Sequence, residues 1–169
     1  KALKGKSIKN AVWSVENSSD IGSGTFAAIL AEAAVTGIYS YSETKTQNIT
    51  TPTLSKLTLH SAEKLDAAWR NGLQRGKAVG EGVNTARHLG NLPGNICTPT
   101  YLAKQAQALA GEKLSVTVMD EKQIAKLGMG AFMSVAAGSD EPAKFIVMNY
   151  RGAAASSAPV VLVGKGITF

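Results

Sequence analysis

The run from Val160 to Val163 is the feature that most limits how this chain can fold. Four consecutive apolar residues follow Pro159, with no polar position between them. An uninterrupted apolar run bounded by turn residues is typical of a strand that is buried on both faces, as in a mostly parallel sheet. Helices cover both faces of such a sheet, so the run predicts an α/β protein.

A single lysine, Lys165, stands between two glycines where this strand should end. Ligands of open α/β sheets bind beyond the carboxyl ends of the strands, which makes Lys165 a candidate functional residue. A phosphate-binding P-loop needs a glycine five positions before the Gly-Lys pair and a Ser or Thr after the lysine, and Pro159 and Gly166 occupy those places. A lysine that extends its charge from a strand end into water is the alternative to a catalytic role.

Composition narrows the class of protein. The 169 residues are 44% apolar and include 17 glycines, as expected of a folded α/β protein with many tight turns. The formal net charge is +6, and Lys1, Lys4, Lys6 and Lys9 contribute to it. This charge permits contact with nucleic acid or acidic surfaces, but a solvated basic end is the interpretation that we favour.

The cysteine content and the two ends give further expectations. The single cysteine, Cys97, excludes an intrachain disulfide and is typical of a reducing, cytoplasmic setting; we interpret it as a small buried residue rather than a nucleophile. No stretch reaches the roughly 18 apolar residues of a membrane span. Because the sequence starts at Lys1 without Met and stops shortly after Lys165, we expect both ends to be cut, the second inside an active site.

The first sixty residues predict a strand, a helix and a second strand. The strands are expected at Ala11 to Val15 and around Leu54 to His60. The helix is expected from Thr25 to Val35, ended by Gly37. Its apolar face should comprise Phe26, Ile29, Leu30, Ala33 and Ala34.

A long helix is predicted from Ala62 to about Arg87, with Ser61 as its cap. Glycine costs up to about 1 kcal/mol at an interior helix position. Three glycines four residues apart, at Gly72, Gly76 and Gly80, therefore indicate that another backbone approaches that face closely.

The second half of the chain predicts the order helix, strand, helix, strand, strand, strand. A helix should begin at Pro99, after the N-cap Thr98, and stop before Gly111. Asp120 should cap a short helix that ends at Gly128. The strands are expected at Leu114 to Met119, Met133 to Ala136, Phe145 to Met148, and Val160 to Val163.

Three stretches carry a family resemblance. They are residues 84–95 (NTARHLGNLPGN) with the nearby Thr98-Pro99, residues 127–131 (LGMGA), and residues 163–169 (VGKGITF). They resemble, in the family's own order, motifs of the cytosolic leucyl aminopeptidases, the two-metal enzymes of the cytosol aminopeptidase (M17) family. Residues 31–39 (AEAAVTGIY) are similar to the last helix of that family's N-terminal domain, so the resemblance covers roughly Phe26 to Phe169.

The resemblance implies an α/β fold in three parts. Residues 1–61 would be the end of a small, macro-like N-terminal α/β domain, and residues 62–87 a linker helix. Residues 88–169 would begin a three-layer α/β/α catalytic domain. The chain would then be an N-terminal fragment of a metal-dependent hydrolase.

The resemblance also implies a role for Lys165. In the family, the lysine of this motif binds one metal of a dinuclear manganese or zinc centre through its amine. Lysine is normally a cation, and it must lose its proton to offer a lone pair. A nearby divalent ion favours that loss because it penalises the ammonium form. Two such metals would polarise the scissile carbonyl and generate a hydroxide nucleophile.

In the family, the other metal ligands and the catalytic lysine follow this motif. The resemblance therefore implies no catalytic residue in this chain, and Lys165 is the one metal ligand that it implies here. The other acids and the histidines match no ligand motif. We interpret them as helix-start charges, loop charges and structural residues; they are Asp120, Glu121, Asp140, Glu141, His60 and His88.

The expected partners of the whole protein are peptide substrates and further copies of itself, since the family forms hexamers. The expected location is the cytoplasm, without a membrane. Two other classes of function stay open. Some bacterial members of the family also bind DNA, although no base-reading motif is present here, and the chain alone is expected to be an inactive scaffold.

Overall fold

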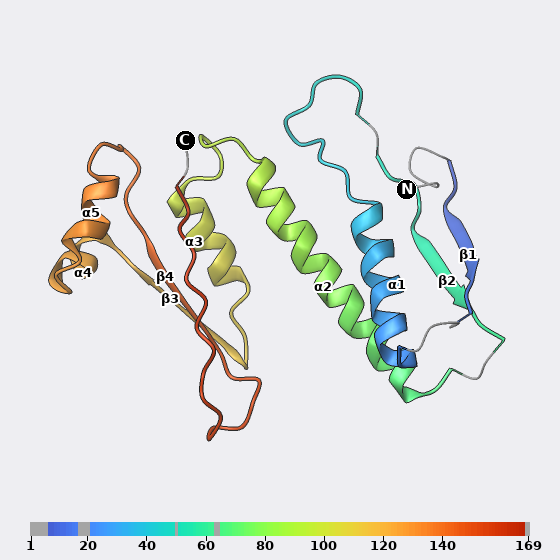
Figure 1. The fold of residues 1–169 in the computed structure, drawn as a ribbon. Coiled ribbons are helices and arrows are strands. Elements are labelled where there is room, and N and C mark those ends of the chain that lie inside the picture. Colours follow the sequence, from blue (N-terminus) through green and yellow to red (C-terminus); the bar gives the residue numbers. More distant parts are fainter. Residues whose placement is uncertain (1–6, 17–20, 50, 63–64, 168–169) are drawn as a thin grey trace. The chain divides into compact units, whose positions relative to one another are not determined.

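A computed structural model describes residues 7–16, 21–49, 51–62 and 65–167. The chain divides into two compact units, Lys1–Asn91 and Leu92–Phe169. Helices and strands both contribute to each unit (Figure 1), so the predicted α/β class is confirmed. The macro-like and three-layer arrangements, and the three-part division of the chain, stay predictions.

The first unit consists of β1 (Asn10–Ser14), α1 (Ser23–Gly37), β2 (Lys56–His60) and α2 (Ala67–Asn91). The two strands are parallel, with Trp13 opposite Leu59. The core of the unit forms where α1 meets α2 and the sheet. It contains Val15, Ala27, Leu30 and Trp69, against which Phe26, Leu59 and Leu73 pack.

The predicted strand, helix and strand of this unit are confirmed, but the predicted apolar face of the helix is wrong in part. Ile29 is 52% exposed, whereas Ala27, Ala28 and Leu30 are buried. The reason is the direction in which α1 faces its neighbour: Ala27 and Ala28 lie against Gly72 and Gly76 of α2.

The long helix begins later and ends later than expected. It starts at Ala67, and the cap is Asp66, whose Oδ1 accepts a hydrogen bond from the Trp69 amide at 2.9 Å. Ser61 lies outside the helix, so the prediction of Ser61 as the cap is wrong. A carboxylate at the N-cap accepts a hydrogen bond from a backbone amide that has no partner inside the helix, and its negative charge interacts favourably with the helix dipole. Asp66 is therefore a suitable residue for this position.

The predicted close approach at the three glycines of α2 is confirmed. Gly72, Gly76 and Gly80 are the glycines buried in this helix. A Cβ atom on Gly72 or Gly76 would collide with the backbone carbonyl of Gly24 or Ala28, respectively. The missing side chains therefore let α1 and α2 approach through their backbones.

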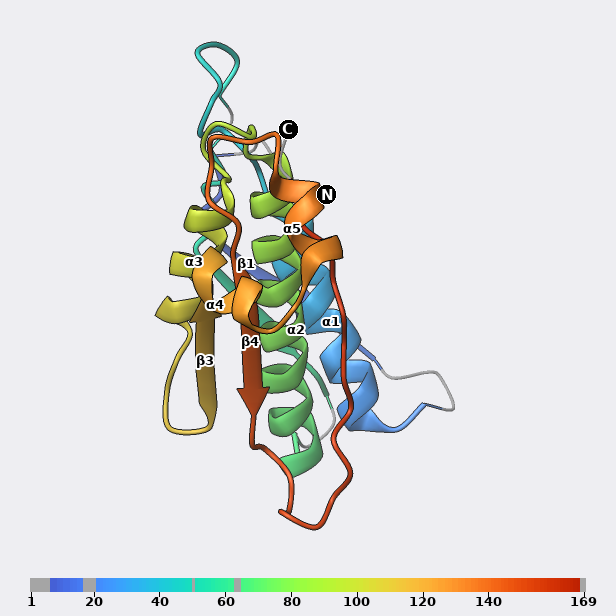
Figure 2. The ribbon, with the colours of Figure 1, turned by 90° about the vertical axis from the view of Figure 1, so that its left-hand side faces the viewer.

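The second unit consists of α3 (Pro99–Ala108), β3 (Leu114–Met119), α4 (Glu121–Lys126), α5 (Gly130–Ala136) and β4 (Phe145–Tyr150). Thr98 caps α3 and its Oγ1 accepts from the Tyr101 amide at 3.2 Å, as predicted. Strands β3 and β4 run side by side and antiparallel, with Thr117 opposite Val147 (Figure 2). The predicted strands at β3 and β4 are thus confirmed.

The predicted strand from Met133 to Ala136 is wrong, since these residues are the end of helix α5. The Met133 amide donates a hydrogen bond to the Met129 carbonyl at 3.1 Å. The ring of Phe132 packs edge-on against that of Phe145, with 5.7 Å between the ring centroids. A run of four mainly apolar residues is too short to show the hydrophobic period of a helix or of a strand. Packing against the rest of the fold therefore decides between the two.

The predicted buried strand from Val160 to Val163 is also wrong for the described structure. These four residues have no regular secondary structure, and their exposed fractions lie between 75% and 94%. A strand needs a neighbour to receive its hydrogen bonds, and the pairs found among the described residues are β1 with β2 and β3 with β4, besides an isolated bridge from Gly111 to Leu114.

The cap of α4 leads to a first prediction. Asp120 accepts a hydrogen bond from the Gln123 amide at 2.9 Å, and the Gln123 side chain accepts one from the Asp120 amide. Asp120→Ala removes one half of this capping box and should lower the free energy of unfolding by about 1 kcal/mol. Urea unfolding measures the change. Asp140→Ala, at an exposed bend, is the control, and an equal loss in both variants would contradict the role of the cap.

Candidate functional site

Lys165 lies on the irregular segment that follows β4, and its side chain is exposed. This segment runs beside α3: a Cβ atom built on the next residue, Gly166, would lie 3.5 Å from Cδ1 of Leu102. A side chain at this position would thus be in ordinary van der Waals contact with the helix. Lys165 is therefore held near one helix of the second unit, without a strand to support it.

The described residues around Lys165 do not fit a metal centre by themselves. Nowhere in residues 7–16, 21–49, 51–62 and 65–167 do three or more His, Cys, Asp or Glu side chains gather closely enough to hold a metal ion. One lysine amine cannot hold two divalent ions, because such ions take several oxygen or nitrogen ligands. The donor set would need ligands beyond those described here.

The acids that were interpreted as helix-start and loop charges have those positions. Asp120 is the cap of α4, and Glu121 lies in the first turn of that helix. The Glu121 carboxylate accepts a hydrogen bond from the Ala143 amide at 2.9 Å, which anchors the loop before β4. Asp140 and Glu141 lie in that loop, outside helices and strands.

The two histidines lie on different elements of the first unit. His60 is the last residue of β2. His88 lies in the last turn of α2, where its Nε2 is 3.2 Å from the Glu43 carboxylate and its ring centroid is 6.0 Å from that of Tyr41. Each histidine is thus placed by its own strand or helix, and the described residues supply neither with a set of metal ligands.

Cys97 is a buried free thiol, as predicted. Burial raises the pKa of the Cys97 thiol because the thiolate loses its hydration. Since the thiolate is the reactive form, the raised pKa makes Cys97 a poor nucleophile.

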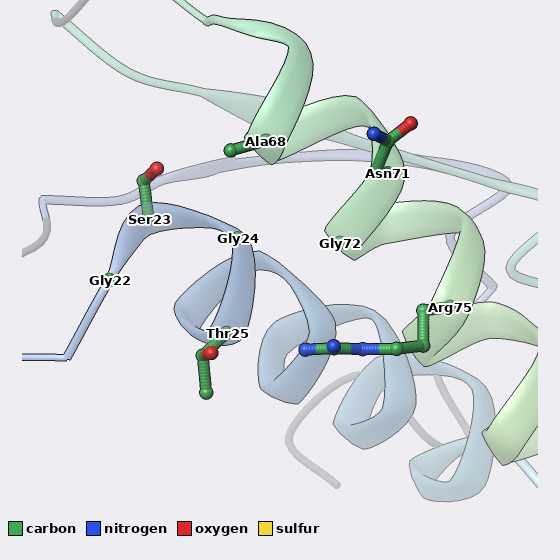
Figure 3. A pocket seen from close by; sticks show the side chains of 8 residues that line it. All are labelled: Gly22, Ser23, Gly24, Thr25, Ala68, Asn71, Gly72 and Arg75. Carbon is green, nitrogen blue, oxygen red and sulfur yellow. The ribbon is translucent and has the colours of Figure 1, made fainter.

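A pocket of about 340 Å³ in the first unit was not predicted from the sequence (Figure 3). It lies at the start of α1, which has no side-chain cap, and beside α2. Its lining residues are Gly22, Ser23, Gly24, Thr25, Ala68, Asn71, Gly72 and Arg75. The lining contains no acid, histidine or cysteine, so no side chain in it acts as a general base near neutral pH. The Gly22-Ser23-Gly24 sequence at the start of α1 was the available signal for it.

Among the described residues, every helix is too short or too polar to cross a lipid bilayer.

Comparison with known proteins gives a consistent result. Residues 84–169 match the catalytic domain of the cytosol aminopeptidase family. The chain is 60% identical over 102 residues to a probable cytosol aminopeptidase of Saccharophagus degradans, a match that covers 59% of this chain and 20% of the relative. It is 46% identical over 145 residues to a cytosol aminopeptidase of Pseudomonas aeruginosa, covering 85% of this chain and 29% of the relative.

The fold agrees with a solved structure as well. A mutant of tomato leucine aminopeptidase superposes with a TM-score of 0.76 at 26% identity, over 86% of this chain and 30% of the tomato chain. The chain thus spans less than a third of the length of each of these relatives.

Proposed function

Since this chain belongs to the cytosol aminopeptidase family, we propose that the protein it is part of is a metal-dependent exopeptidase that releases N-terminal residues, leucine among them, from peptides. The observation that carries this proposal is the match of residues 84–169 to the family's catalytic domain. The three motifs lie in the family's order in the same region, and the last of them contains Lys165.

We further propose that Lys165 is one ligand of a centre with two divalent ions, manganese or zinc. Its exposed position supports this, because an amine at the surface of the second unit is accessible to further ligands. The described residues do not complete such a centre. The remaining ligands would therefore lie outside the residues that the structure describes.

The proposals on partners and location rest on family membership alone. Peptides would be the substrates, the whole protein would assemble as a hexamer, and it would work in the cytoplasm. The described structure has no feature that favours DNA binding over these roles, so DNA binding stays an alternative suggested by the +6 charge.

The test compares the 169-residue chain with the whole protein. Both are incubated with a leucine anilide and manganese, and separately with zinc. We expect the whole protein to release the anilide and to lose this activity when a chelator removes the metal. The chain alone should show no turnover, because its described residues provide no set of metal ligands besides Lys165.

Two outcomes would contradict the proposal. Turnover by the chain alone, persisting through purification and above a blank without protein, would mean that the site is complete within these residues. A whole protein that is folded and binds metal, yet cleaves neither anilides nor peptides, would contradict the exopeptidase function itself.

A further inference from the structure

We draw no further inference here: the strongest candidate, the pocket of about 340 Å³ between the start of α1 and the side of α2, rests on a helix N-terminus with the exposed side chain of Arg75 beside it, and among the described residues no side chain that is buried without a hydrogen-bond partner points into it.

Discussion

Lys165→Arg in the whole protein is expected to lower the catalytic rate by at least about a hundredfold and to empty one of the two metal positions that we propose for it. Arginine keeps the positive charge of lysine, but its guanidinium does not deprotonate in proteins and offers no lone pair to a metal. Loss of a metal ligand removes charge stabilisation that is worth several kcal/mol in such sites, which sets the size of the effect. Elemental analysis of the purified protein, measured beside the rate, checks both parts.

Lys165→Met separates the ligand role from a role of the charge. Methionine keeps an unbranched side chain of similar length and removes the amine, so it should have the same effect as arginine. Lys126→Arg, in the last turn of α4, is the matched control and should change neither rate nor metal content. If Lys165 merely extends its charge into water, Lys165→Arg will be nearly silent. Full occupancy of both proposed metal positions in Lys165→Arg would mean that Lys165 is not a metal ligand.

Gly76→Ala is expected to lower the free energy of unfolding by about 1–3 kcal/mol, although alanine favours a helix more than glycine does. The added Cβ atom would collide with the backbone carbonyl of Ala28, which cannot rotate away as a side chain can. The helices α1 and α2 would have to separate locally. Gly76→Leu should cost more, because its whole side chain would have to fit into the same contact.

Gly82→Ala is the matched control on the same helix. A Cβ atom at this position has no neighbour within 4 Å, so only the helix propensity changes, and stability should rise by about 0.5–1 kcal/mol. Urea unfolding followed by tryptophan fluorescence measures both variants, because Trp69, one of the two tryptophans, is buried in the core beside this interface. Equal effects of the two substitutions would mean that α1 does not approach α2 as closely as described.

Local signals account for the parts of the fold that were predicted correctly. Thr98 followed by Pro99, and Asp120 three residues before Gln123, define helix starts through hydrogen bonds between neighbours in sequence. The strand from Leu114 to Met119 is rich in β-branched residues and bounded by polar ones, and it was located to the residue. The spacing of Gly72, Gly76 and Gly80 predicted that another backbone approaches this face of the helix. Glycine destabilises a helix interior, so three glycines on one face indicate a contact that excludes side chains.

Only part of the candidate site could be predicted from the sequence. The Gly-Lys-Gly sequence identifies Lys165 as a residue of interest, and the family resemblance assigns it to a metal. The contacts of Arg87 with Thr36 and Tyr39 could not be predicted from the sequence, because these partners lie about fifty positions earlier in the chain. No local sequence pattern predicts a contact that folding creates between distant segments.

By itself, then, the sequence determined the α/β class, most helix and strand positions, the glycine contact and the family. Tertiary structure alone decided that Met133 to Ala136 is helical, that Ile29 faces away from the core, and that Val160 to Val163 has no paired strand among the described residues. For Ile29, the position of α2 decides which side of α1 is buried. For the other two segments the physical reason is the same. A short apolar segment is compatible with helix, strand or loop, and the groups that pack or hydrogen-bond against it select one of them.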